Sequence, residues 1–421
     1  MNVNISPRFQ GLALPDPLAN PLDALLADIA VSVQLPPGLH QQACERKAAV
    51  QRYLERPASS LPWVIFRFYA QGSMAIDATI STRGTDDEYD LDLVIELLVP
   101  PGTPPGQVLD ELCKALRDYP VARVTRQTRC VTLHYSDGMH LDLTPARRLP
   151  NTMEFGSVIF HAKPEDSQLL HGEIAMNAYG FANWYNAKAP PEERFSLAYH
   201  SRLAKAYGMS VAADAVDHPV PDQTPLTRKS VTTVGLQLIK RFRNIWSSTR
   251  DERYPPSVML SCHAGHATSP GMPLGEMVIR QARWTARAIE KAEALGQRLD
   301  VRNPIMSDDC FTDRWPENRA QQRAFAEALH DLANGLEYIG RTGEQLEDVQ
   351  DWLRDIFGPA VVSKSIQSFV QRTGHALRAT QQSYAPSGRL YVPSAPAIIG
   401  TASALSSVVP ARAHTNMGEK R

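Results

Sequence analysis

The chain has 421 residues, of which 43% are apolar and 21% are charged, and this length predicts roughly two to three folding units. Lys and Arg number 44 and Asp and Glu number 45, so the net charge is -1, which excludes a protein that attracts nucleic acid or anionic lipid through its overall charge. Five scattered cysteines argue against a disulfide framework, and the apolar runs fall short of the roughly 18 residues that a membrane span needs. We therefore expect a cytoplasmic protein with no membrane partner.

Residues 1–62 are predicted to form an N-terminal segment that contains one long helix. The stretch from Pro21 to Leu35 is apolar but interrupted, whereas apolar residues recur on one helix face from Gly38 to Arg56. The residues on this face are Leu39, Ala43, Val50 and Leu54. The β-branched and aromatic run from Trp63 to Ala70 then predicts a buried strand that leads the chain to Gly72.

Residues 63–165 are predicted to form a core of strands and helices. The segment from Tyr89 to Glu96 alternates at period two before becoming continuously apolar, which predicts a strand with one exposed end. A helix is expected from Val108 to Arg117. Two further strands, Arg129 to Tyr135 and Met139 to Thr144, flank Asp137-Gly138, a strong signal for a two-residue hairpin. This pattern predicts a mixed sheet with helices.

Residues 166–383 are predicted to be mostly helical, because apolar residues recur there at helical spacing. The expected helices are Ser167 to Ala187, Glu193 to Ala206, Ser230 to Ser247, Pro256 to Ala264, Leu274 to Gly296, Asn318 to Asn334 and Glu344 to Phe357. Residues 384–421 are rich in Pro, Ser and Ala, a composition typical of a flexible tail.

Three carboxylates point to a metal site. Asp90 and Asp92 lie two positions apart on a predicted strand, so their side chains project from the same face. Asp142 lies on the second arm of the predicted hairpin between two leucines, where an unpaired charge would be costly. Three carboxylates around two Mg²⁺ ions are suited to phosphoryl transfer, because the ions activate an attacking hydroxyl and stabilise a leaving pyrophosphate.

The Gly72-Ser73 pair follows a predicted strand and precedes a short segment that can open a helix. Backbone N–H groups and a hydroxyl in this arrangement can face phosphate oxygens. The pair alone is more typical of an ordinary turn at the end of a strand. The pair becomes informative because it precedes Asp90, Asp92 and Asp142 along the chain.

In that order the motifs resemble those of the polymerase-β-like nucleotidyltransferases. The strings Gln71-Gly72-Ser73-Met74-Ala75 and Asp87-Glu88-Tyr89-Asp90-Leu91-Asp92-Leu93-Val94 closely resemble the bacterial cGAS/DncV-like nucleotidyltransferases, or CD-NTases. The resemblance extends to two later segments, Gln237 to Arg243 and Pro255 to Ser261. It implies an α+β fold with two lobes, a polymerase-β-like catalytic core joined to a mostly helical domain that closes the nucleotide site.

The resemblance also implies an activity and the residues that perform it. CD-NTases join ribonucleoside triphosphates into cyclic di- or trinucleotide second messengers in anti-phage defence and release pyrophosphate. Asp90, Asp92 and Asp142 would hold two Mg²⁺ ions, for which Mn²⁺ can substitute. The triphosphate of a substrate such as ATP or GTP would lie against Gln71, Gly72, Ser73, Lys240 and Ser257. The expected protein is a monomer, with regulatory or effector proteins encoded in the same operon as partners.

Other interpretations remain open. A template-independent RNA or tRNA nucleotidyltransferase shares this core but needs a long basic groove, for which Arg241, Arg243 and Arg253 are the local candidates. A catalytically silent nucleotide-binding scaffold is disfavoured by the intact carboxylates. Lys240 and its basic neighbours are also compatible with the wet face of an amphipathic helix. The spacing of Cys262, His263 and His266 does not match a common zinc finger.

Overall fold

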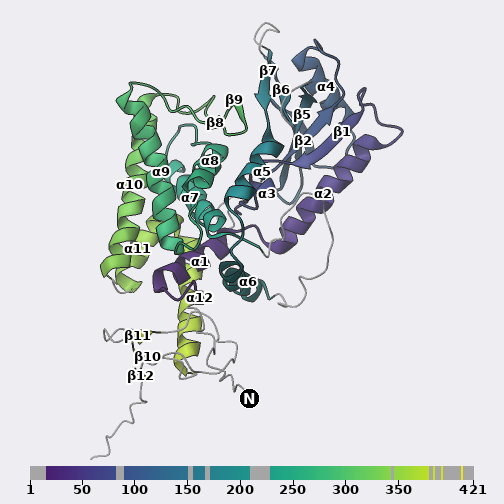
Figure 1. Cartoon of the computed structure of the whole chain (residues 1–421). Helices are drawn as coiled ribbons and strands as arrows, with labels where there is room; N and C mark the ends of the chain where they lie inside the picture. The colour runs from purple at the N-terminus through teal and green to yellow at the C-terminus, as the bar shows by residue number, and fades with distance from the viewer. Residues whose placement is uncertain are drawn as a thin grey trace, which may run out of the picture.

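The computed structural model describes residues 16–81, 90–149, 155–165, 171–208, 228–342 and 346–378, together with three two-residue strands near the C-terminus. Two lobes lie side by side (Figure 1), one built on a mixed sheet and the other made almost entirely of helices. This arrangement is the predicted α+β fold. None of the helices in the described part of the chain combines the length and the apolar character needed to cross a bilayer.

A seven-stranded sheet forms the first lobe. Five strands lie in the order β1-β2-β5-β4-β3, and β6 and β7 extend the sheet from β5. Only the β2–β5 pair is parallel among these neighbours. The strands are β1 (Ile65–Ala70), β2 (Asp90–Leu97), β3 (Arg123–Arg126), β4 (Val131–His134), β5 (His140–Arg148), β6 (Ser157–His161) and β7 (Gly172–Met176).

One hydrophobic core unites this sheet with helices α2 (Pro37–Glu55) and α4 (Pro105–Ala115). The predicted face of α2 is confirmed, because Ala43, Val50 and Leu54 are buried in this core and Leu39 packs at its edge. The predicted hairpin is also confirmed. Gly138 has a φ of 85°, a conformation that glycine adopts without strain, and β4 pairs with β5 in antiparallel register.

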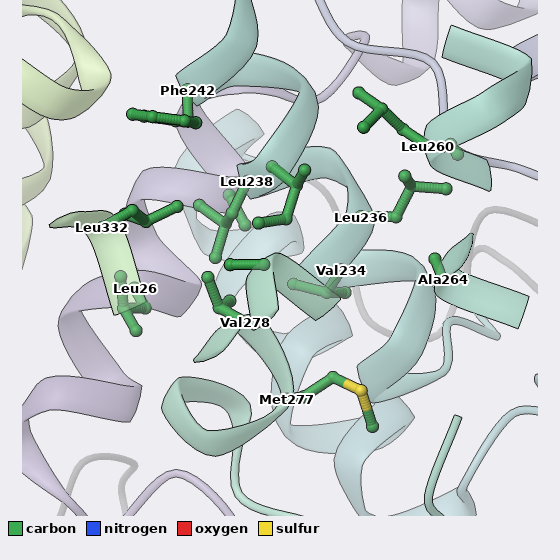
Figure 2. Packing of buried hydrophobic residues seen from close by; sticks show 14 of the residues in the cluster. Leu26, Val234, Leu236, Leu238, Phe242, Leu260, Ala264, Met277, Val278 and Leu332 are labelled. Carbon is green, nitrogen blue, oxygen red and sulfur yellow. The ribbon is translucent and has the colours of Figure 1, made fainter. Parts of the chain in front are cut away.

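The helical lobe is centred on α7 (Val231–Ser247), which is buried on nearly every side. Figure 2 shows its Val234, Leu236, Leu238 and Phe242 among apolar side chains from four other helices. The Ser230 hydroxyl caps the helix by accepting a hydrogen bond of 3.0 Å from the Thr233 N–H. The surrounding helices are α1 (Pro21–Val33), α5 (Ala178–Lys188), α6 (Glu193–Tyr207), α8 (Ser257–Ala267), α9 (Leu274–Ala294), α10 (Arg319–Thr342), α11 (Leu346–Phe357) and α12 (Pro359–Arg378).

The single helix predicted from Ser167 to Ala187 is wrong. In its place β7 and α5 follow one another, and β7 pairs with β6. The break falls at Asn177, whose side-chain oxygen accepts a hydrogen bond of 2.8 Å from the Gly180 N–H and so starts α5. The sheet therefore continues to Met176, beyond the predicted boundary at residue 165. The division of the chain into domains otherwise stays a prediction.

Two helices have no counterpart among the predictions. The interrupted stretch near Pro21 is α1, which Asn20 caps and which is buried almost all round, so it lacks an amphipathic period. The other is α12, which packs along α1. A short hairpin, β8 (Arg302–Asn303) with β9 (Met306–Cys310), interrupts the helical half.

The predicted tail lies mostly outside the described residues. Three short strands near the C-terminus pair into a small sheet, so part of the tail has regular backbone. They are β10 (Ser383–Tyr384), β11 (Leu390–Tyr391) and β12 (Val409–Pro410).

Candidate active site

The carboxylates are positioned by the parallel pair of strands β2 and β5. Asp92 lies opposite Asp142 in the register, and Asp90 lies opposite His140. Alternate residues of a strand share a face, so this register gathers the predicted carboxylates on one face of the sheet. The side chain of Asp90 is outside the described part of the structure, so its predicted role is supported by its backbone position alone.

Gly72 brings the turn after β1 into contact with Asp92. It begins the short helix α3 (Gly72–Ala75) with a φ of 59°, and a Cβ atom at this position would lie 2.8 Å from Oδ2 of Asp92. The backbone N–H of Gln71 donates a hydrogen bond of 2.9 Å to the carbonyl oxygen of Asp92. A side chain at residue 72 would thus both strain the backbone and displace a carboxylate.

The structure brings Lys240 to Ser73. The Lys240 Nζ atom donates hydrogen bonds to Oγ of Ser73 at 2.5 Å and to the carbonyl oxygen of Ala78 at 2.8 Å. Lys240 is only 3% exposed, so the interpretation of this helix face as solvated is wrong. The pKa of Lys240 is lowered from 10.5 to about 7, chiefly by burial and further by the charge of Arg243, against the opposing charge of Asp92.

Ser257 lies at the first turn of α8 and is held by Arg243 rather than by Lys240. The Arg243 guanidinium donates a hydrogen bond of 2.9 Å to Oγ of Ser257 and one of 2.8 Å to the carbonyl oxygen of Pro255. Burial lowers the pKa of Arg243 to about 10. Arg243 therefore connects the two predicted phosphate ligands, since it bonds to Ser257 and its charge acts on Lys240.

Several residues of the site were not predicted. Thr132 donates a hydrogen bond of 2.5 Å from Oγ1 to Oδ1 of Asp142, and Thr144 accepts one of 3.3 Å from the amide of Gln71. Thr132 pairs with Asp142 across the β4–β5 hairpin. The hairpin register that follows from the Asp137-Gly138 turn could therefore have predicted that Thr132 lies beside Asp142. Arg243 was predicted only as a candidate for a basic groove, although its position one helical turn after Lys240 already indicates that the two side chains lie close together.

The donor set suits a hard divalent cation, because carboxylate oxygens are the ligands that Mg²⁺ prefers. Among the residues described, no cluster of three or more His, Cys, Asp or Glu is placed to hold a metal. Asp92 and Asp142 are the two members of the predicted set whose side chains the structure describes. The buried His263 instead forms a hydrogen bond of 3.2 Å with Thr285, which gives it a structural role in the helical lobe.

Gly72 lies against Asp92, Asp92 lies opposite Asp142, and the buried Lys240 bonds to Ser73; this is the combination of residues predicted for a nucleotidyltransferase site. Residues 66–145 match the family model described as "Cyclic GMP-AMP synthase DncV-like, nucleotidyltransferase domain". The chain is 56% identical over 407 residues to the cyclic dinucleotide synthase CdnG of Bradyrhizobium diazoefficiens, covering 96% of this chain and 97% of that protein. The chain belongs to the bacterial CD-NTase family.

Solved structures agree with this assignment. The structure of the Bradyrhizobium diazoefficiens CD-NTase CdnG in complex with GTP is 54% identical, has a TM-score of 0.74, and is matched over 83% of this chain and 99% of that one. The Escherichia coli CdnC structure with ATP is only 14% identical, with a TM-score of 0.52 over 79% of this chain and 96% of that one, and shows the fold alone. The predicted family, fold class and nucleotidyltransferase activity in cyclic nucleotide synthesis are confirmed.

Proposed function

We propose that this protein joins two ribonucleoside triphosphates, with GTP among them, and closes the linear product into a cyclic dinucleotide. The observation that carries the proposal is the contact of Lys240 with Ser73 beside the Asp92–Asp142 pair. It places a cation and a hydroxyl next to carboxylates, as transfer of a nucleotidyl group requires. The relative named a cyclic dinucleotide synthase and the GTP complex of CdnG support the product class and the substrate.

Asp142 would orient the acceptor. The hydrogen bond from Thr132 to Oδ1 fixes the orientation of this carboxylate, which would act on the acceptor ribose hydroxyl. That hydroxyl forms a P–O bond at the donor α-phosphorus, the bond between the α- and β-phosphates breaks, and pyrophosphate leaves. The hydroxyl proton passes to the Asp142 carboxylate. The same step on the linear intermediate closes the ring.

Ser73, Lys240 and Ser257 would hold the donor triphosphate. A phosphate oxygen that approaches Ser73 meets the Lys240 ammonium directly, and the buried position strengthens this charge-assisted contact. Gly72 leaves room for the phosphates because it has no side chain facing Asp92. Gln71 anchors the turn through its backbone bond to β2.

Asp90, Asp92 and Asp142 would hold Mg²⁺, with two ions as the expected number and Mn²⁺ as a substitute. The ions would lower the pKa of the attacking hydroxyl and neutralise charge on the leaving pyrophosphate. The cytoplasm, where ribonucleoside triphosphates are available, is the compartment that this substrate requires. A role in anti-phage defence and control by operon-encoded proteins are part of the same proposal.

The test is to incubate the protein with all four ribonucleoside triphosphates and Mg²⁺ and to identify the products by mass spectrometry. We expect a cyclic dinucleotide that contains guanine. The Asp90→Ala, Asp92→Ala double variant should form none while keeping its melting temperature, because removing clustered carboxylates relieves repulsion. Asp118→Asn, an exposed acid on the sheet lobe, is the matched control and should keep full activity.

Long linear products would favour a template-independent polymerase instead. Nucleotide binding without any product would favour a silent scaffold. Substantial synthesis by the folded double variant would contradict the assignment of the carboxylates.

A further inference from the structure

Three successive backbone carbonyl groups, just after the turn that carries Ser73, each accept a hydrogen bond from a side chain of α7 or of the residues that precede it. The bonds run from Lys229 to Asp77 at 2.5 Å, from Lys240 to Ala78 at 2.8 Å and from Gln237 to Thr79 at 3.0 Å. All three donor residues are buried. We call residues 77–79 the carbonyl strip.

The carbonyl strip lies where the chain passes from one hydrophobic core to the other. Met74, in α3, belongs to the core of the sheet, whereas Ile76 and Ala78 belong to the core around α7. The Ala78 N–H donates a hydrogen bond of 2.9 Å to the carbonyl oxygen of Ser73, so the strip is tied back to the turn. A shift of the strip would therefore move Ser73 relative to α7.

Asp77 bends the backbone at the start of the strip. Its φ is 52°, in the left-handed region that residues other than glycine rarely adopt. Such a conformation persists only where the surrounding structure holds it. Lys229 holds it through two contacts, because its Nζ atom bonds to the carbonyl oxygen of Asp77 and forms an ion pair of 3.2 Å with Oδ1. The side chain of Lys229 is only 1% exposed, so these contacts are closed to water.

The two charges of this pair depend on one another. Burial raises the pKa of Asp77 and lowers the pKa of Lys229, and in each case the charge of the partner opposes the effect. Oδ2 of Asp77 is buried and has no hydrogen-bond partner in the described part of the chain, so Lys229 is the cation that balances this carboxylate. Removal of one partner would leave a charge buried and unpaired, whereas removal of both would not.

Lys240 takes its direction from the carbonyl strip. An ammonium group has three N–H donors, and Lys240 uses two of them in the bonds to Oγ of Ser73 and to the carbonyl oxygen of Ala78. With two donors fixed, the direction of the third is fixed as well. A lysine side chain is flexible when it is free, so this anchoring removes freedom that phosphate binding would otherwise have to remove.

We propose that Lys229 and Asp77 are positioning residues for the donor triphosphate. They hold the carbonyl strip, and through Ala78 they hold Lys240 against Ser73 before the nucleotide binds. This inference rests on the proposed function, which assigns the donor triphosphate to Ser73 and Lys240. Because the pair acts through Lys240, its loss should weaken the binding of the β- and γ-phosphates and spare the rest of the nucleotide.

The experiment compares the binding of a non-hydrolysable GTP analogue with that of GMP, which lacks the β- and γ-phosphates, by calorimetry in the presence of Mg²⁺. Lys229→Met should raise the Kd of the analogue by roughly tenfold and that of GMP by less than about twofold. The Asp77→Asn, Lys229→Met double variant leaves no charge of the pair behind, and Asn tolerates a left-handed backbone. It should melt at a higher temperature than Lys229→Met while binding the analogue just as weakly.

Arg202→Met is the matched control. Arg202 is a buried cation of the helical lobe that, like Lys229, bonds to a carboxylate and to a backbone carbonyl group, but its partners Asp28 and Ala24 belong to α1. This variant should lose thermal stability and keep the wild-type ratio of the two Kd values.

A wild-type Kd of the analogue in the double variant would overturn the inference, and this variant decides alone if Lys229→Met does not fold. A Lys229→Met variant that weakens the analogue and GMP by the same factor would overturn it too, since a merely structural lysine would act in that way. So would a selective loss of the analogue in Arg202→Met, because any lost buried ion pair would then have the same effect. A wild-type protein that binds the analogue no more tightly than GMP contradicts the proposed function itself, and the inference with it.

Discussion

Nucleotide binding should take up a proton through Lys240. In the structure burial brings the pKa of this lysine down to about 7, so at pH 8 it is mostly neutral. A bound triphosphate places negative charge beside Nζ and raises that pKa again. Each pKa unit is worth about 1.4 kcal/mol, so return to the usual 10.5 corresponds to about 5 kcal/mol.

The sign of the effect follows from the two proton counts. Between pH 7 and the pKa of the bound state, the free protein lacks a proton that the complex holds, so affinity falls as pH rises. If the pKa in the complex is near 10.5, the Kd rises by roughly fiftyfold between pH 7 and pH 9, approaching about tenfold per pH unit. The free energy of unfolding of the free protein also rises as pH increases above 7, because the unfolded chain holds a proton on Lys240 that the folded protein lacks.

The assay is isothermal titration calorimetry with a non-hydrolysable GTP analogue in buffers of different ionisation enthalpy. We expect close to one proton bound per nucleotide at pH 8. Lys240→Met should abolish both this uptake and most of the pH dependence, which separates the lysine from titration of the nucleotide itself. Lys205→Met, an exposed lysine on α6, should retain both. Equal proton uptake by wild type and Lys240→Met would refute the reasoning.

Three further predictions concern the turn, the carboxylate and the tail. Gly72→Ala should lose synthesis as well as about 1 to 2 kcal/mol of stability, because its φ is 59° and its Cβ would meet Asp92. Gly102→Ala is the control: its φ is 82°, but nothing lies within 4 Å of the added Cβ, so this variant should lose stability and keep synthesis. Thermal melting measures the stability of both variants, and product yield measures their synthesis. Thr132→Val should lower kcat by roughly tenfold through the lost bond to Asp142, with the KM for the donor unchanged, and an equal change in both would contradict this. Deletion after Ser383 should leave synthesis intact, and a large loss would show that the tail packs on the catalytic body.

The parts that the sequence predicts well depend on local patterns. The Asp137-Gly138 turn sets the β4–β5 register, and the two-residue spacing of Asp90 and Asp92 sets their common face. Six of the seven helices predicted in the second half agree with the structure to within a few residues at each described end, except that α10 continues to Thr342. Apolar residues recur in these helices at one regular spacing, so each helix can be recognised from its own sequence without knowing which helix it packs against.

The parts that it predicts poorly depend on distant partners. β7 becomes a strand because β6 offers an edge to pair with, and α1 shows no helical period in its sequence because nearly every side of it is buried. The burial of Lys240 requires Ser73 and Ala78, which lie 167 and 162 residues earlier in the chain. A cavity of about 480 Å³ is likewise lined by residues far apart in the chain, such as Lys163 and Arg314, so no contiguous sequence motif predicts it.

The pairing of α1 with α12 has a consequence for synthesis on the ribosome. The two helices are joined by Ser32 with Ser365 and by Asp28 with Arg372, yet the whole sheet lobe lies between them in the chain. At about 5 to 20 residues per second, tens of seconds separate their emergence. Until α12 emerges, the face of α1 that packs against it lacks its native cover, whereas α6, α7 and α9, which also contact α1, and the whole sheet lobe are synthesised earlier. We therefore expect this face of α1 to be covered last and to be a site where a chaperone binds the nascent chain.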